Sequence, residues 1–132
     1  MKRFLSVLLM VSMILSLVTV PVSAEIIEGK YENYSWNFDT SNYTLTVEGQ
    51  GAITENNWNK YQTKIQTVII GEGITEIGTE VFGKHYNISE IYFPSTLQYL
   101  GISAFLHCNK IKSIHYPGSQ EQWEENEKVD MD

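Results

Sequence analysis

Three residues near the carboxyl end of this 132-residue sequence have side chains that could bind a metal ion or attack a substrate. His107 and Cys108 are adjacent, and His115 follows seven residues after the cysteine. Imidazole and thiolate groups are ligands that zinc prefers. Adjacent side chains of an extended segment point in opposite directions, however, and His115 falls at an outward position of a predicted strand.

Cysteine chemistry is not supported either, because no histidine and amide can be placed beside Cys108 to activate its thiol. Cysteine side chains without such partners commonly pack in protein interiors as small hydrophobic groups. We therefore expect no metal site, no cofactor and no nucleophile.

A second group of acidic residues could act as paired catalytic carboxylates. Glu121, Glu124 and Glu125 lie near the end of the sequence, and side chains three or four positions apart share one face of a helix. Glycoside hydrolysis requires two carboxyl groups held across a cleft at a defined separation, and an exposed terminal helix supplies no cleft. We predict that the protein is not an enzyme, and a secreted hydrolase remains as the enzymatic alternative.

A third group of residues is suited to binding. In the strands predicted below, outward side chains form two neighbouring columns. Aromatic, apolar and acidic side chains lie next to one another there, a combination that both protein contacts and sugar stacking use. One column holds Thr44, Thr67, Glu90 and Ser113, and the other holds Thr46, Ile69, Tyr92 and His115. We predict that Thr67, Ile69, Glu90, Tyr92, Ser113 and His115 form a ligand-binding surface.

These columns depend on an internal repeat of 23 residues. Each unit begins with a short strand whose apolar side chains, two positions apart, face the core. A turn follows, and apolar residues at helical or turn-like spacing then close the loop over the strand. The aligned positions are Ile65, Ile88 and Ile111; Val68, Ile91 and Ile114; Ile70, Phe93 and Tyr116; Gly78 and Gly101; and Phe82 and Phe105.

One such loop cannot bury its apolar side alone. Stacking copies about 4.8 Å apart joins the strands into a parallel ladder and makes the inward side chains a continuous core. We predict an α/β repeat fold, a short solenoid with 23-residue units. The alternative is a compact α/β domain whose periodicity is accidental.

Both ends of the array are predicted to be capped. Residues 36–38 and 43–47 form a β-hairpin around a turn-rich segment, and its second strand can continue the ladder. Trp58, Tyr61 and Ile65 follow at the spacing of one helical face. At the other end, Ser119 and Gln122 match a capping box that opens a short helix, on which Trp123 could cover the end of the core. We assign residues 25–64 to the amino-terminal cap, 65–118 to the repeats, and 119–132 to the carboxyl-terminal cap helix and an acidic tail.

Residues 1–24 have the features of a secretory signal peptide. Lys2 and Arg3 precede an apolar run over residues 4–20, and Val22-Ser23-Ala24 offers small residues for cleavage. A retained span would need about 20 apolar residues, and Pro21 follows the run directly, so we expect removal and no membrane span in the mature chain.

The charge and the cysteine content narrow the possible partners. Residues 25–132 carry 7 basic and 16 acidic residues, a net charge of −9, which disfavours nucleic acid and anionic membranes. A single cysteine permits no intrachain disulfide, and an exported domain without disulfides fits bacterial secretion.

The last complete unit contains Leu100-Gly101, Ala104-Phe105, Cys108, Ile111, Ile114 and Pro117, and the unit before it contains Ile77-Gly78, Val81-Phe82, Ile88, Ile91 and Pro94. These residues resemble the repeat of the BspA-like leucine-rich-repeat proteins. The family pattern combines an isoleucine-glycine turn, a small residue before phenylalanine, a cysteine, and a strand followed by proline.

This resemblance implies a leucine-rich-repeat solenoid, secreted or exposed on a bacterial surface, with adhesion to host proteins or other cells as its role. Two features depart from the family. His85 occupies the place of a second cysteine, and only about two and a half repeats are present.

Three functions remain as predictions. The first is a secreted or surface-exposed binding module that contacts an extracellular protein or a glycan of unknown identity. The second is a structural or regulatory repeat protein without a ligand of its own. The third is the secreted hydrolase.

Overall fold

A computed structural model of the chain describes residues 23–125 and 127–128, and the structural statements that follow concern these residues. Most of the predicted signal peptide, residues 1–22, lies outside them, as do residues 129–132 of the predicted acidic tail. No helix in the described part of the chain is both long enough and apolar enough to cross a membrane.

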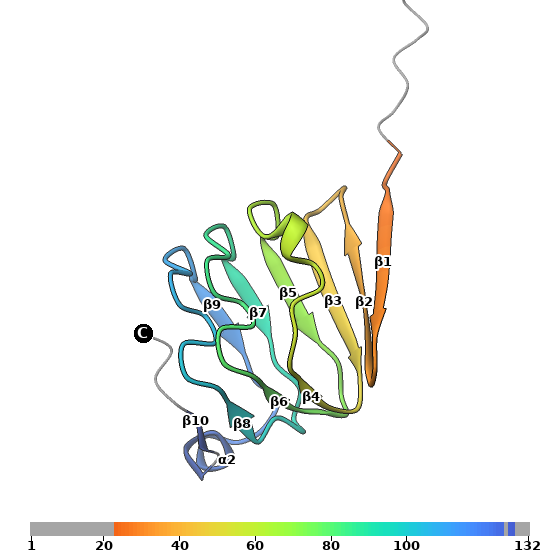
Figure 1. Cartoon of the computed structure of the whole chain (residues 1–132). Helices are drawn as coiled ribbons and strands as arrows, with labels where there is room; N and C mark the ends of the chain where they lie inside the picture. The colour runs from red at the N-terminus through yellow and green to blue at the C-terminus, as the bar shows by residue number, and fades with distance from the viewer. Residues whose placement is uncertain (1–22, 126, 129–132) are drawn as a thin grey trace, which may run out of the picture.

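The main feature is a six-stranded sheet that runs the length of the molecule (Figure 1). In spatial order its strands are β1 (Ile26–Tyr31), β2 (Tyr34–Asp39), β3 (Thr44–Gly49), β5 (Thr67–Ile70), β7 (Glu90–Tyr92) and β9 (Ser113–His115). From β3 onward the strands are parallel, and the paired residues of neighbouring strands are 23 positions apart in the chain. The predicted repeat solenoid and its 23-residue unit are therefore confirmed.

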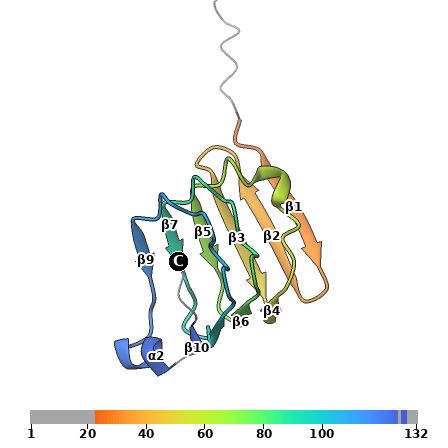
Figure 2. The ribbon, with the colours of Figure 1, turned by 60° about the vertical axis from the view of Figure 1, so that its left-hand side comes forward.

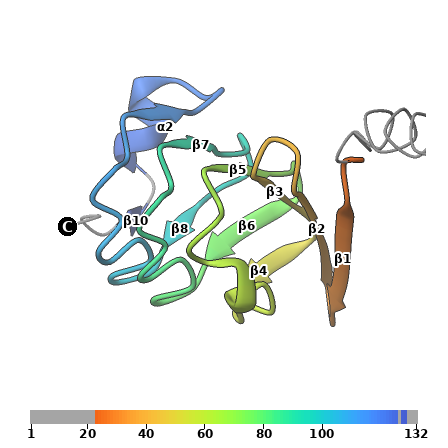
Figure 3. The same ribbon diagram turned by 90° about the horizontal axis from the view of Figure 1, so that it is seen from above.

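A second, smaller sheet closes the other side of each turn. It consists of β4 (Gly51–Ile53), β6 (Ile74–Ile77), β8 (Tyr99–Leu100) and β10 (Glu127–Lys128), all parallel. Seen from above in Figure 3, β4, β6 and β8 form a second row of strands beside β5 and β7. From the spacing of Ile74 and Ile77, the sequence predicted either a helical or a turn-like conformation where the structure has β6. The two side chains are buried although three positions apart, which an irregular short strand permits.

The core fills the space between the two sides of each turn. The inward side chains of β5 and β7 are at most 3% exposed. On the other side of the turn, Ile74 and Ile77 of β6 are fully buried. At the centre, the rings of Trp58, Phe82 and Phe105 stack with centroid separations of 5.2 and 5.0 Å. Burial of one such side chain contributes about 1.5 to 3 kcal/mol, so this row is a major source of stability for a chain without disulfides.

Close approach of the backbone requires the glycine of the Leu100-Gly101 turn. Gly78 and Gly101 are 23 residues apart, and a Cβ atom at Gly101 would lie 2.5 Å from the Thr79 nitrogen and 2.6 Å from the Gly78 carbonyl carbon. The Gly101 amide donates to the carbonyl of Ile77 at 2.7 Å. Successive turns pack backbone against backbone here, and only glycine fits.

The amino-terminal cap contains the predicted hairpin, formed by β2 and β3, and one strand that sequence reasoning did not find. This strand, β1, is paired antiparallel with β2. The Trp36 ring covers Gly29 of β1, where any Cβ would lie within 2.3 Å of the ring. The predicted helical segment is a single 3-10 turn, η1 (Asn59–Tyr61).

The carboxyl-terminal cap is the short helix α2 (Gln120–Glu125). The predicted capping box is present. The backbone N–H of Gln122 donates to Ser119 Oγ at 3.1 Å, and the backbone N–H of Ser119 donates to Gln122 Oε1 at 2.8 Å. Trp123 packs against the core, with its ring centroid 5.8 Å from that of Phe93. The chain then returns to form β10, so part of the predicted tail joins the second sheet.

The predicted core residues of the last unit are less buried than those before it: Ile111 and Tyr116 are partly buried, and Ile114 is exposed. Val68 and Ile91 are fully buried, whereas Ile114, at the same position of the last unit, is 39% exposed. The reason is its place in the ladder, because among the described residues β9 is the outermost strand of the six-stranded sheet.

Candidate functional site

The predicted binding residues occupy one face of the six-stranded sheet. We call outward face the side chains directed away from the core at the paired positions of β3, β5, β7 and β9, namely Thr44, Thr46, Thr67, Ile69, Glu90, Tyr92, Ser113 and His115. The strand register places them in two columns as predicted. Thr44, Thr67, Glu90 and Ser113 are successive partners in one column, and Thr46, Ile69, Tyr92 and His115 in the other.

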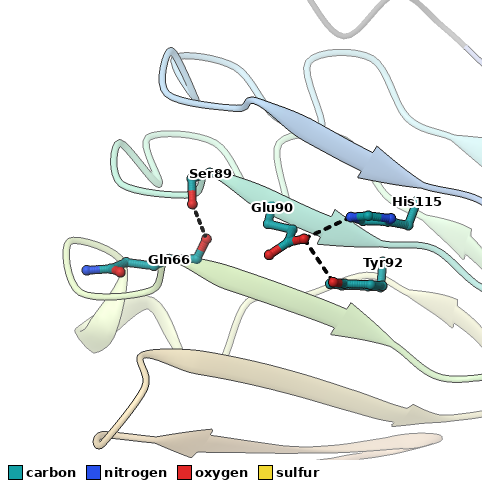
Figure 4. A network of polar contacts seen from close by, with 5 residues as sticks. All are labelled: Gln66, Ser89, Glu90, Tyr92 and His115. Carbon is teal, nitrogen blue, oxygen red and sulfur yellow. Dashed lines mark hydrogen bonds and ion pairs between the residues drawn. The ribbon is translucent and has the colours of Figure 1, made fainter.

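The centre of the outward face is a hydrogen-bonded network of three side chains (Figure 4). The Tyr92 hydroxyl donates to Glu90 Oε1 at 2.8 Å, and His115 Nε2 lies 2.8 Å from the same oxygen. Since a carboxylate only accepts hydrogen bonds, we infer that Nε2 of His115 carries a proton. The side chains of His115 and Glu90 are 47% and 37% exposed, so the network is accessible from solvent.

These contacts set the ionisation of Glu90. The hydrogen bonds from Tyr92 and then from His115 lower the pKa of Glu90 below its ordinary value, so that its carboxylate is ionised at neutral pH. The same hydrogen bond from the Tyr92 hydroxyl to Glu90 raises the pKa of Tyr92, because the proton is held by the carboxylate. The centre of the outward face therefore carries an ionised carboxylate.

Ring stacking sets which parts of the aromatic side chains a ligand can reach. The Tyr92 and His115 rings are nearly parallel, with an interplanar angle of 6° and centroids 4.2 Å apart. One face of the Tyr92 ring is therefore covered by His115. On its other side the register places Ile69, which is 37% exposed. The strip of Ile69, Tyr92 and His115 offers ring edges and aliphatic groups more than open ring faces.

The remaining predicted residues are neighbours of the network by register. Thr67 and Ser113 flank Glu90 in its column, with Thr67 half-buried and Ser113 exposed. At the start of the strands, Ser89 Oγ donates to the Gln66 carbonyl at 3.3 Å (Figure 4), which ties β7 to β5 beside the network.

Cys108 and the histidines do not form a metal site in the described residues. No group of three or more histidine, cysteine, aspartate or glutamate side chains there is placed to hold a metal ion. Cys108 is 8% exposed, and its thiol donates to the Phe82 carbonyl at 3.1 Å. Burial raises the pKa of this thiol to about 11, which keeps it protonated and unreactive at neutral pH.

His85 is a feature whose role sequence reasoning missed. It is fully buried, and its Nε2 accepts a hydrogen bond from Trp58 Nε1 at 3.1 Å. The sequence indicated an unusual residue here, because His85 occupies a position where the family pattern has cysteine. Only the structure shows that a tryptophan 27 residues earlier supplies its partner.

The fold and the outward face define a short leucine-rich-repeat solenoid with an accessible parallel ladder. A family described as "BspA type Leucine rich repeat region (6 copies)" matches residues 16–127. The chain belongs to this BspA-type leucine-rich-repeat family. A comparison with curated proteins gave no match.

Two solved structures are similar to the chain. A leucine-rich repeat protein from Eubacterium ventriosum has 23% sequence identity and a TM-score of 0.59 over 68% of this chain. A leucine rich cell surface protein from Faecalibacterium prausnitzii has 18% identity and a TM-score of 0.43 over 70% of this chain. The chain spans 28% and 31% of the lengths of these proteins.

Proposed function

We propose that the protein is a secreted or surface-exposed binding module whose outward face contacts a basic patch on an extracellular protein. The observation that carries this proposal is the exposed column of Ile69, Tyr92 and His115 beside the ionised carboxylate of Glu90. The family membership supports a binding role rather than catalysis, and one of the similar structures is described as a cell surface protein.

Electrostatics favours a basic partner. Residues 25–132 carry 16 acidic and 7 basic residues, and the network places a carboxylate at the centre of the outward face. Tyr92 and His115 both bind Oε1 of Glu90, and the second carboxylate oxygen, Oε2, is suited to a lysine or arginine of the partner. Complementary charge raises the association rate and selects the partner.

Preorganisation supports the same surface. The hydrogen bonds and the ring stacking hold Glu90, Tyr92 and His115 in one arrangement before a partner arrives. Ordering side chains on binding costs about 0.5 to 1.5 kcal/mol for each flexible side chain, and this cost is reduced where the side chains are already ordered. Tyrosine is also enriched among the residues that dominate binding energies.

A protein is favoured over a glycan because of the ring stacking. Sugars bind aromatic residues through an open ring face, and one face of Tyr92 is covered by His115 at 4.2 Å. Ring edges, an aliphatic side chain and a carboxylate are the contacts of a protein surface. A glycan partner is an outcome that the experiment below distinguishes.

The experiment captures partners from host secretions and extracellular matrix with the mature chain, residues 25–132, and then measures affinity for each purified partner. The test variant is Tyr92→Ala with His115→Ala. The matched control is Ile102→Ala, which removes a side chain that is 59% exposed and lies outside the outward face. We expect the double variant to lose about 30-fold or more in affinity, as for an interface hot spot of about 2 kcal/mol.

The salt dependence and the identity of the partner decide between the alternatives. Binding to a basic protein should weaken with ionic strength, and Glu90→Gln should reduce this dependence measurably. An unchanged affinity of the double variant contradicts the proposed surface. Specific capture of a glycan contradicts the partner class, and the absence of any saturable partner favours the structural alternative.

A further inference from the structure

The last strand of the six-stranded sheet has an open edge. In Figure 2, β9 is the outermost strand at one end of the ladder and β1 lies at the other. Among the described residues, β9 is paired with β7 alone. Its central side chain, Ile114, belongs to the inward column but is 39% exposed, whereas Val68 and Ile91 in that column are fully buried.

The backbone of Ile114 is directed toward this edge. On the β7 side, the Ser113 amide donates to the Ser89 carbonyl, and the His115 carbonyl accepts from the Phe93 amide. Because successive residues of a strand direct their amide and carbonyl groups to alternate sides, the N–H and C=O groups of Ile114 point away from β7. Such an edge is a template for another strand.

A shallow apolar hollow adjoins the edge. Its apolar lining comes from Ile114, Tyr116 and Trp123, with Ser119 and Gln120 at its border, and its volume is about 450 Å³. A strand added beside β9 would place alternate side chains over this hollow, which would cover the part of Ile114 that the described residues leave exposed.

The charges on the two sides of β9 are opposite. Lys112 is exposed directly before the strand, and Glu121, Glu124 and Glu125 are exposed on α2 after it. An antiparallel copy of the same segment would bring each positive side next to a negative one. The edge is therefore complementary to itself under a two-fold rotation.

We infer that a second copy of this chain binds at β9, with the two β9 strands antiparallel about a two-fold axis through Ile114. In this register the two Ile114 residues face each other and exchange both backbone hydrogen bonds. Ser113 lies opposite His115 of the second copy. Lys112 lies opposite Tyr116 of the second copy, where its stem covers the hollow and its ammonium group approaches the aromatic rings and the glutamates of α2. The dimer forms one continuous sheet and places two outward faces side by side.

The other edge is less suited to this role. The β1 strand is longer, but the hollow beside it is lined mainly by charged and polar residues, among them Glu28, Lys30 and Glu48, so pairing there would cover little apolar surface. Gly29 at its centre adds no side chain that could bury apolar surface. Association is therefore expected through β9 and not through β1.

The first test is sedimentation equilibrium of the mature chain. Because a short edge gives a small interface, the measurement covers protein concentrations of about 0.01 to 1 mM. We expect a monomer–dimer equilibrium that Ile114→Lys shifts toward the monomer by at least about tenfold in dissociation constant. Lys112→Glu should weaken the dimer as well, and circular dichroism verifies that both variants are folded. The matched control is Ile26→Lys on β1, whose side chain is 49% exposed.

A monomer at every concentration overturns the inference. So does association that Ile26→Lys abolishes, or masses that grow beyond the dimer, because a head-to-tail contact between β9 and β1 would produce an open fibre.

The second test traps the register. Directly opposite residues of a hydrogen-bonded antiparallel pair have Cα atoms about 5.5 Å apart, within the range that a disulfide spans. Ile114→Cys should form a covalent dimer on mild oxidation. The control is Ile102→Cys, a more exposed site away from the edge, and equal cross-linking of both variants contradicts the proposed register. Cys108 does not compete, because it is buried.

Discussion

Acidification should destabilise the fold through His85, and the structure shows why. The His85 side chain is fully buried. Its Nδ1 lies 3.0 Å from the Gly83 carbonyl, which only accepts hydrogen bonds, so Nδ1 carries the ring proton. Nε2 accepts from Trp58 Nε1 at 3.1 Å. Protonation of Nε2 would bring two N–H donors together, and the buried cation would lack a counter-charge.

The pKa of His85 is accordingly lowered from its ordinary 6.5, mainly by burial, although hydrogen bonds with the backbone of Gly83 and Phe82 offset part of the effect. As the pH falls below about 6.5, the unfolded chain binds a proton at this position and the folded chain does not. The free energy of unfolding therefore decreases, by up to about 1.4 kcal/mol per pH unit. The loss begins near the unfolded pKa and is complete only below the lowered pKa of the folded state.

Carboxylates contribute in a more acidic window. Hydrogen bonds from Ser41 lower the pKa of Asp39 from 3.8, and hydrogen bonds from Ser95 lower the pKa of Glu72 from 4.5. The stabilisation that these groups provide is present above their unfolded pKa values and is lost as the pH falls through the folded ones. The interval from about pH 6.5 to about pH 5 therefore reports on histidines.

The assay is urea unfolding followed by tryptophan fluorescence from about pH 7.5 to about pH 5. Two variants remove the titrating ring: His85→Cys restores the residue of the family pattern, and His85→Gln retains a hydrogen-bond acceptor for Trp58. Either variant is expected to change the stability at neutral pH, so the informative quantity is the slope against pH. We expect the wild type to lose stability more steeply than both variants. Equal slopes in the three proteins would refute the assignment of a neutral, buried His85.

Three further predictions concern packing and reactivity. Gly101→Ala should destabilise the protein by about 1 to 3 kcal/mol, because the added Cβ would lie 2.5 Å from the Thr79 nitrogen. An unchanged urea midpoint would contradict this packing. Phe82→Ala should lower the free energy of unfolding by about 3 to 5 kcal/mol, because it leaves a cavity between the rings of Trp58 and Phe105. A decrease below about 1 kcal/mol in the same assay would argue against the central stack. The Cys108 thiol, with its pKa raised to about 11, should react with a thiol reagent at about pH 8 only when urea unfolds the chain, whereas reaction of the folded protein at the rate of free cysteine would show that the thiol is accessible.

The parallel ladder was predictable because two periods agree in the sequence. Leu45, Val68 and Ile91 recur every 23 residues, and within each strand the apolar residues alternate, so a single register satisfies both patterns. The columns of the outward face follow from this register. The hydrogen bonds of Glu90 to Tyr92 and His115 do not follow from it, because spacing fixes the column of a side chain but leaves its rotamer open.

The second sheet and β1 were not predictable by the same reasoning. Strands β8 and β10 have two residues each, too short to show alternation, and Glu127 and Lys128 carry no apolar signal. In β1, Ile27 and Tyr31 alternate with exposed residues, but Gly29 between them lacks the side chain that would have completed the pattern. Its place is taken by the Trp36 ring of the neighbouring strand, a contact that only the folded chain reveals.

The 23-residue register also has a consequence for how such a gene can change. Each turn of the solenoid contacts mainly the turns before and after it, and β3 pairs with β5 as β5 pairs with β7, at the same offset. An in-frame duplication of 23 codons would therefore add one complete turn and preserve both caps. A duplication of one codon more or fewer would leave one turn with an extra or a missing residue, and the loop of that turn would have to absorb it for the next strand to keep its register. Unequal recombination can thus lengthen or shorten the array in whole turns, and selection can tune the number of turns without redesigning the ends.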